Sequence, residues 1–184
     1  MNKSYRLSCI TKNGTNPAYE GARLGAARVA SRMGGVVQHS YPIVPDDISE
    51  QGALIEAALN EKPDAILLAP VHPTALNPVI RKIKDAGIPL IYFVSATEGI
   101  KPQTYITSNN HALAVAIAER LINSIGGSGN LALIEGSNNS PTSAPRTKGF
   151  LDAAAAHSDI RVVAQKSGAY QRADAHQAMT DILK

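Results

Sequence analysis

The sequence contains no tryptophan, only two phenylalanines and a single cysteine in 184 residues. One cysteine excludes an internal disulfide framework and any zinc site that needs several thiolates. No run of 18 apolar residues occurs, so the sequence predicts no membrane-spanning helix. Because tryptophan is absent, any aromatic surface for a ligand must come mainly from the six tyrosines. The hydrophobic fraction of 44% is ample for a packed core and argues against disorder.

The sequence also lacks a strong excess of positive or negative charge. The net charge is only +3, and the lysines and arginines are spread along the chain, which argues against a nucleic-acid partner. The N-terminal decapeptide MNKSYRLSCI lacks the long apolar segment of a signal peptide. A processed secretory protein restarted from a new Met1 would look the same, so the compartment stays open at this point.

Short apolar runs alternate with segments of helical period along the whole chain. The runs at 65–69 and 90–94 lack the alternation of a half-exposed strand, which is typical of strands covered on both faces. Pro17 and the Asp46-Asp47 pair are typical of helix starts. Strands are predicted at 6–11, 36–41, 65–69, 90–94, 105–107, 131–134 and 161–166, and helices at 17–33, 46–60, 74–86, 110–125, 143–156 and 172–183. This alternation predicts an α/β fold with parallel sheets and right-handed crossovers.

A weak internal repeat suggests two lobes. The stretch VVQHSYPIVPDDISEQGALIEAALN from Val36 resembles VVAQKSGAYQRADAHQAMTDILK from Val162, although doubly wound units can resemble one another by chance. We therefore expect an N-terminal α/β lobe over 1–107 and a partial C-terminal α/β lobe over 108–184. The second copy stops where the first continues with three more strands. Such a truncated lobe would leave a sheet edge open to dimerisation or strand exchange.

In a parallel sheet, ligands bind beyond the carboxyl ends of the strands. The loops there are rich in Asn, Ser, Thr, Gly and Tyr, which suits hydrogen bonding to a neutral polar ligand. They are poor in His, Cys and paired acids, so we predict no catalytic residue, no metal site and no cofactor. Neither G-x-G-x-x-G after the first strand nor G-x-x-x-x-G-K-[ST] is present. The loop 136–142 could cradle a phosphate, and a plain helix cap explains it equally well.

Four side chains are candidates for a binding site on local grounds. Asn16 and Tyr19 place an amide and a ring after the first strand. Arg146 lies in the first turn of a predicted helix, where a cation opposes the helix dipole, and its forked donors would suit ligand hydroxyls. Tyr170 follows the strand at 161–166 and could stack on a ring whose C–H bonds are apolar. A solvated arginine and a tyrosine that covers a helix explain the last two equally well.

Five segments match a known family in their order and spacing. They are TNPAYEGARLGA, DAILLAPVHPTAL, AGIPLIYFVSA, YITSNN and SAPRTKGFLDA. In these segments the chain resembles the N-terminal two-thirds of periplasmic sugar-binding proteins of the ribose-binding type, which serve ABC importers. The same architecture occurs in the effector domains of lactose-repressor-type regulators. The resemblance implies the periplasmic binding protein-like I fold, with two doubly wound lobes that close on a ligand, the second one truncated here.

The resemblance also implies roles for individual residues. Asn16 and Tyr19 match the amide and ring of the family's first loop. Arg146 matches the family's ligand arginine, and Tyr170 matches its second-domain aromatic residue. Asn109 stands near a family aspartate where the chain crosses between the lobes. These matches imply a ligand held by residues from both lobes.

Two departures from the family pattern concern the ligand. Ala18 stands where many relatives place a second aromatic residue, and Val94-Ser95 stands where many have an Asp-Arg pair for sugar hydroxyls. The family's later ligand residues, an Asn, an Asp and a Gln, have no counterpart in the 184 residues. The complete predicted ligand-binding set is Asn16, Tyr19, Ser95, Asn109, Arg146 and Tyr170.

The function that the resemblance implies is that of the substrate-binding component of an ABC importer. It would bind a carbohydrate or polyol in the cleft between the lobes, in the periplasm, with a membrane permease as its partner and without catalysis. The alternative is the ligand-sensing domain of a lactose-repressor-type transcription regulator that lacks its DNA-binding head. No basic DNA-binding sequence precedes Tyr5, which favours the importer. A dimer through the incomplete second lobe is a further expectation.

Overall fold

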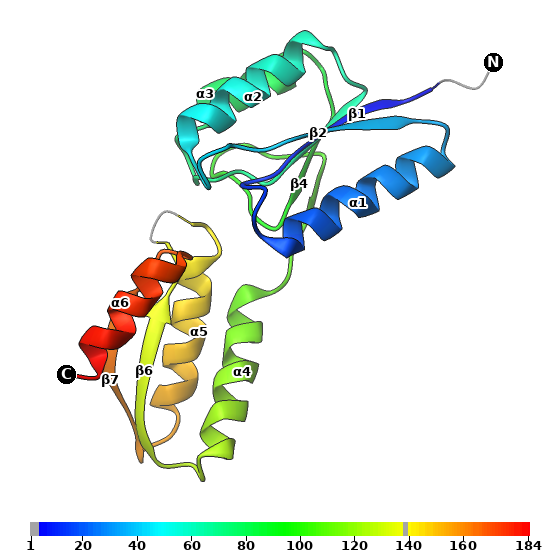
Figure 1. Ribbon diagram of the computed structural model, residues 1–184. Coiled ribbons are helices and arrows are strands. Elements are labelled where there is room, and N and C mark those ends of the chain that lie inside the picture. The colour runs from blue at the N-terminus through cyan, green and yellow to red at the C-terminus, as the bar shows by residue number, and fades with distance from the viewer. Residues whose placement is uncertain (1–3, 138–139) are drawn as a thin grey trace. The chain divides into compact units, whose positions relative to one another are not determined.

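The computed structural model describes residues 4–137 and 140–184. The chain divides into two compact units, Met1–Thr107 (unit 1) and Ser108–Lys184 (unit 2). Strands and helices follow one another along the chain, and every strand pair is parallel, which confirms the predicted α/β class (Figure 1). Among the described residues, no helix is both long and apolar enough to cross a membrane.

Unit 1 is a five-stranded parallel sheet with helices on both faces. The strands are β1 (Arg6–Ile10), β2 (Val36–Ser40), β3 (Ala65–Leu68), β4 (Leu90–Phe93) and β5 (Thr104–Ile106), and the helices are α1 (Pro17–Arg32), α2 (Ile48–Asn60) and α3 (Asn77–Asp85). The strand order is β2-β1-β3-β4-β5. Helix α1 covers one face, and α2 and α3 cover the other (Figure 1). The carboxyl ends of the strands therefore meet at one edge of the sheet, and their loops gather there.

The core of unit 1 lies where the sheet meets α2 and α3. Ile66 and Leu68 of β3 are fully buried, as are Ile10 of β1 and Tyr92 of β4. Ile80 and Ile83 of α3 are also fully buried, which agrees with the three-residue spacing of an amphipathic helix. Burying a side chain of this size contributes about 1.5–3 kcal/mol. The core thus holds the carboxyl edge of the sheet on a rigid base.

Helix α3 begins three residues later than the sequence predicts. The Nδ1 atom of His72 accepts hydrogen bonds from the backbone N–H groups of Thr74 (3.1 Å) and Ala75 (3.0 Å). The N–H of Asn77 donates to the carbonyl of Thr74 at 2.9 Å. The histidine therefore stabilises a turn over 74–76, and Pro78 falls in the first turn of the helix, where its missing N–H costs least.

Unit 2 begins with a helix and continues with a strand–helix succession around a smaller sheet. It contains α4 (Asn110–Ser124), β6 (Gly129–Glu135), α5 (Ser143–Ala155), β7 (Ile160–Ser167) and α6 (Arg172–Ile182). Strands β6 and β7 are parallel, with a register shift between Leu131 and Ala132. The order β6–α5–β7–α6 repeats the order β1–α1–β2–α2 of unit 1. Within the described residues, β6 pairs with β7 alone.

Helices α4 and α5 lie side by side in unit 2 (Figure 1). Their backbones approach closely at Gly149, where an added Cβ atom would lie 2.4 Å from the carbonyl oxygen of His111. Ile122 of α4 and Ala154 of α5 form a small core with Leu131 of β6 and Ile160 of β7. Glycine at position 149 therefore permits the close approach of the two helices.

Candidate functional site

At the carboxyl edge of unit 1, a polar network ties the loop after β1 to the loop after β2. Thr11, Lys12 and Asn13 are all buried directly after β1. The Asn13 side chain accepts a hydrogen bond from the N–H of Asn16 at 3.0 Å and donates to Asp46 Oδ1 at 3.2 Å. Asp46 has a φ of 63° and donates its own N–H to the Lys12 carbonyl at 3.1 Å. The two loops are thus held as one rigid surface.

Arg23 of α1 places a positive charge against the loop after β1. Its Nη1 atom donates to Thr11 Oγ1 at 2.9 Å and to the Asn13 carbonyl at 3.2 Å. The guanidinium carbon lies 4.9 Å from the centroid of the Tyr41 ring, a cation–π contact. Through Nη1, Arg23 therefore ties α1 to the loop after β1.

Burial and the charge of Arg23 set the ionisation of the neighbouring strand residues. Burial raises the pKa of the Cys9 thiol to about 11, and the nearby Arg23 only partly offsets this. Burial, with a contribution from Arg23, lowers the pKa of the His39 imidazole. The Cys9 thiol therefore stays protonated near neutral pH, which is unfavourable for a nucleophile.

Gln51 of α2 links the carboxyl ends of β1 and β3 through hydrogen bonds to the backbone. This side chain of α2 is fully buried, and its Nε2 atom donates to the carbonyls of Thr11 (3.3 Å) and Ala69 (3.0 Å). Its Oε1 atom accepts from the N–H of Val71 at 2.9 Å. One amide thereby satisfies three backbone groups that continue the two strands. Gln51 was not among the sequence candidates.

Asn16 and Tyr19 lie together at the start of α1. Asn16 is exposed and caps the helix, because its Oδ1 atom accepts the N–H of Ala18 at 2.9 Å. Tyr19 is only 7% exposed, so most of its ring packs inside unit 1. The amide of Asn16 is therefore the more accessible of the two candidate groups.

Ser95 lies at the carboxyl end of β4 and is fully buried. Its hydroxyl donates to the carbonyl of Pro70 at 2.9 Å, and its N–H donates to the carbonyl of Phe93 at 2.7 Å. The preceding residue, Val94, has a φ of 65°. Ser95 thus holds the loop after β4 to the loop after β3 rather than standing at the surface.

The candidates of unit 2 are Asn109, at the start of α4, and Arg146 and Tyr170, which line one pocket. Asn109 is exposed and caps α4, accepting the N–H of Ala112 at 3.0 Å. Its neighbour Asn110 accepts a hydrogen bond from Arg146 Nε at 2.8 Å, which fixes the arginine against α4. Tyr170 is 49% exposed and has a φ of 59°. Asn110, which orients Arg146, was not among the sequence candidates, which included only its neighbour Asn109.

Arg146 and Tyr170 share one pocket of about 340 Å³ in unit 2. An added Cβ atom at Gly136 would lie 2.1 Å from Tyr170 Cζ, so glycine is required for the ring to occupy this place. The rest of the lining combines apolar side chains with a few polar ones: Leu113, Ala114, Ile117, Leu133, Ile134, Glu135, Ser143, Thr147 and Phe150. A pocket lined by a guanidinium, an aromatic ring and apolar side chains can bind a molecule that has both hydroxyl groups and C–H faces. Residues 138 and 139 of the 136–142 loop lie outside the described residues.

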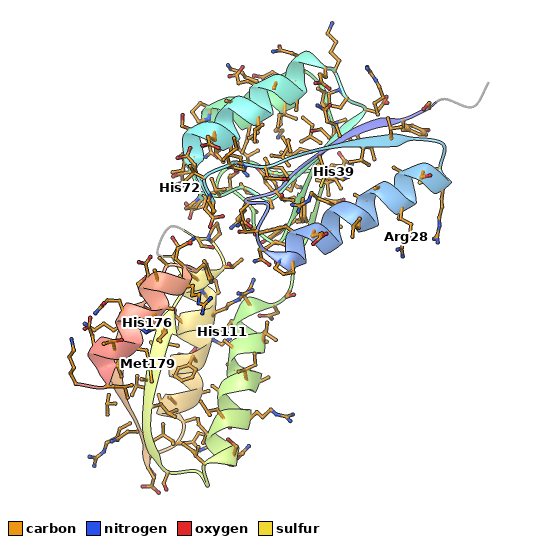
Figure 2. All side chains as sticks on the ribbon, viewed as in Figure 1. Arg28, His39, His72, His111, His176 and Met179 are labelled. Carbon is orange, nitrogen blue, oxygen red and sulfur yellow. The ribbon has the colours of Figure 1, made fainter. Side chains whose placement is uncertain are left out.

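The histidines belong to separate elements (Figure 2). His72 stabilises the turn before α3, and His111 pairs with Asp152 at 2.7 Å. His157 pairs with Glu119 at 3.0 Å. Across residues 4–137 and 140–184, no group of three or more His, Cys, Asp or Glu side chains is placed to hold a metal ion.

Comparison with curated proteins shows relatives that are named as binding proteins. The chain is 25% identical over 184 residues to a D-apiose import binding protein of Actinobacillus succinogenes, covering 97% of this chain and 57% of that protein. It is 26% identical over 134 residues to a xylitol-binding protein of Mycolicibacterium smegmatis, covering 73% of this chain and 38% of that protein. The chain thus spans about half the length of these relatives or less. Neither is named as an enzyme or a transcription regulator.

Solved structures share the fold over nearly the whole chain. An ABC transporter periplasmic solute-binding protein of Actinobacillus succinogenes with bound D-allose is 26% identical, with a TM-score of 0.91. That match covers 98% of this chain and 65% of the other chain. A solute-binding protein of Agrobacterium vitis with bound D-fucose is 26% identical, with a TM-score of 0.87, and the match covers 97% and 63% of the two chains. The fold prediction is confirmed.

The family itself follows from a match along almost the entire sequence. The model of the periplasmic binding protein domain matches residues 8–184, from within β1 to the last residue. The chain belongs to the periplasmic binding protein domain family.

Proposed function

We propose that this protein captures an uncharged sugar or polyol and releases it chemically unchanged, as the substrate-binding component of an ABC importer. The observation that carries the proposal is the pocket of unit 2, which is lined by both Arg146, bonded to Asn110, and Tyr170. Forked guanidinium donors suit vicinal hydroxyls, and an aromatic face suits the C–H side of a sugar ring. The names of the relatives, which include xylitol and D-apiose, support the same ligand class.

We place the ligand between the two units, with Asn16 contributing from unit 1 and Asn109, Arg146 and Tyr170 from unit 2. Tyr19 and Ser95 then act as supports, since both are buried. Contacts to both units would favour a closed state over an open one, and this difference in affinity is the only source of the shift. The closed, loaded protein would deliver its ligand in the periplasm to a membrane permease.

Titration of the whole chain tests the proposal. Isothermal calorimetry and thermal unfolding are measured with xylitol, D-apiose, D-allose, D-fucose and D-ribose, with L-glutamate as a charged control. A true ligand at a hundred times its Kd stabilises the folded state by about 2.7 kcal/mol. If no sugar or polyol gives heat or raises the unfolding temperature, the proposal is wrong.

Arg146→Ala tests the pocket itself. The variant loses the forked donors and is expected to bind the sugar at least about tenfold more weakly, which corresponds to about 1.4 kcal/mol. Arg161→Ala, at an exposed arginine of β7 outside the pocket lining, is the matched control and should bind within twofold of the unmodified chain. Equal affinity of the two variants would remove Arg146 from the site.

A further inference from the structure

Helix α4 has apolar residues on two of its sides. On the inner side, Ala118 and Ile122 are fully buried, and Ile122 belongs to the small core of unit 2. On the outer side, Leu113, Ile117 and Leu121 follow one another at four-residue spacing and are exposed; we call these three residues the outer row. A helix that is apolar on more than one side is typical of a helix that is covered on more than one side. The outer row is therefore a candidate contact surface.

The charged and bulky residues of α4 leave the outer row uninterrupted. Glu119 is paired with His157, directly after α5, at 3.0 Å, so its charge serves the contact between α4 and its neighbour within unit 2. Ala116, which is exposed beside the row, is small enough for another helix to approach closely. A contiguous exposed apolar surface of this kind marks an interaction site.

The outer row is symmetric about Ile117. Leu113 precedes Ile117 by four residues and Leu121 follows it by four, so the order leucine–isoleucine–leucine is the same in both directions. Two antiparallel copies related by a two-fold axis at Ile117 would place Ile117 against itself and Leu113 of each copy against Leu121 of the other. The two Arg120 side chains would not meet, because each would lie across from Ala114, about 9 Å from the other along the helix axis. Such a self-complementary surface is what a symmetric dimer requires.

We propose that α4 forms the interface of a two-fold symmetric dimer of this chain, in which the outer rows of two copies pack antiparallel. The inference goes beyond the proposed function and does not depend on sugar binding. The contact is one face of a 15-residue helix from each copy, about 22 Å long. An interface of this size is typical of weak association. We therefore expect a dimer that dissociates at micromolar concentrations.

Sedimentation velocity of the 184-residue chain over about 5–500 µM tests the inference. No sugar is added, because Leu113 and Ile117 also line the pocket of unit 2. The unmodified chain should change from monomer to dimer as its concentration rises. Ile117→Glu places two like charges at the axis and should raise the Kd of the dimer at least about tenfold. Val163→Glu is the matched control, since Val163 of β7 and Ile117 are both 59% exposed, and it should leave the Kd within about twofold.

A pair of opposite charges tests the two-fold axis itself. Ile117→Lys alone should also stay monomeric. An equimolar mixture of Ile117→Lys and Ile117→Glu should associate, because the axis places position 117 of one copy against position 117 of the other. Circular dichroism verifies that each variant is folded.

Three results would each overturn the inference. The first is an unmodified chain that stays monomeric over the whole range, whether or not its outer row binds an apolar dye. The second is a Val163→Glu variant that dissociates as readily as Ile117→Glu. The third is a mixture of the two Ile117 variants that associates no more tightly than either alone. The sugar titration decides the proposed function separately from all three.

Discussion

The two units share a β-α-β-α succession, which in unit 2 follows helix α4, but the first strand of that succession has different numbers of neighbouring strands. In unit 1, β1 has β2 on one edge and β3 on the other, whereas β6 of unit 2 pairs with β7 alone within the described residues. Over residues 4–137 and 140–184, the buried core cluster of unit 1 contains twelve residues and that of unit 2 contains four. Equal local sequence patterns therefore yield unequal cores, because burial depends on the number of neighbouring elements.

Helix α4 shows the consequence on the surface of unit 2. Leu113, Ile117 and Leu121 follow one another at four-residue spacing and are 43%, 59% and 41% exposed. This spacing is typical of an apolar helix face that packs on a core. In unit 1, by contrast, the apolar residues Ile80 and Ile83 of α3 are fully buried. The difference predicts that unit 2 opens more readily than unit 1.

Amide hydrogen exchange should show the largest effect. The amides of β1 and β3 that bond to neighbouring strands should be protected about a thousandfold more than those of β6 that bond to β7, a difference of about 4 kcal/mol in opening free energy. Mass spectrometry of exchanging peptides, or NMR, measures this strand by strand. Similar protection in the two sheets would show that the units unfold as one cooperative body and would contradict the comparison.

The fold was largely predictable because the patterns that specify it are local. The unbroken apolar run of β4 and the helix-start residues Pro17 and Asp47 are visible in short windows of sequence, and the structure places their elements within a few residues of the predicted ones. Helix α3 was the exception. Its late start depends on a hydrogen bond from the backbone to His72, which no apolar periodicity reveals.

The candidate site was less predictable because its order comes from contacts across long sequence separations. Gln51 bonds to backbone groups of Thr11 and Ala69, 40 and 18 residues away, and Arg146 is held by Asn110 from 36 residues away. A buried glutamine and an exposed one look alike in sequence, and the positive φ of Val94 has no sequence signal except its position after a strand. Sequence thus indicated the edge of the sheet and the residue types, but not which side chains face outward.

Gln51→Leu tests the polar bridge that distinguishes unit 1. Leucine fills a similar volume but leaves the carbonyls of Thr11 and Ala69 and the N–H of Val71 without this partner. We expect unit 1 to lose about 3 kcal/mol of unfolding free energy, measured by urea unfolding followed by circular dichroism. Gln38→Ala is the control, since the exposed side chain of Gln38 bonds to the exposed side chain of Glu61, so its effect should stay below about 0.5 kcal/mol. Equal effects of the two variants would show that the bridge does not stabilise unit 1.

Gly149→Ala tests the close contact between α4 and α5. We expect this contact to stabilise unit 2, in which β6 has only β7 as a strand neighbour within the described residues. The added methyl group would meet the carbonyl of His111 at 2.4 Å, which is backbone and cannot move aside without shifting α4. We expect a loss of about 2 kcal/mol confined to unit 2, measured as faster amide exchange in α4 and α5 with unchanged exchange in β1. Gly25→Ala in α1 is the matched control, because open space surrounds that position and alanine favours helix by about 1 kcal/mol. If Gly149→Ala were as harmless as Gly25→Ala, the contact between α4 and α5 would be looser than the structure shows. The stability of unit 2 would then have to come from its small core alone.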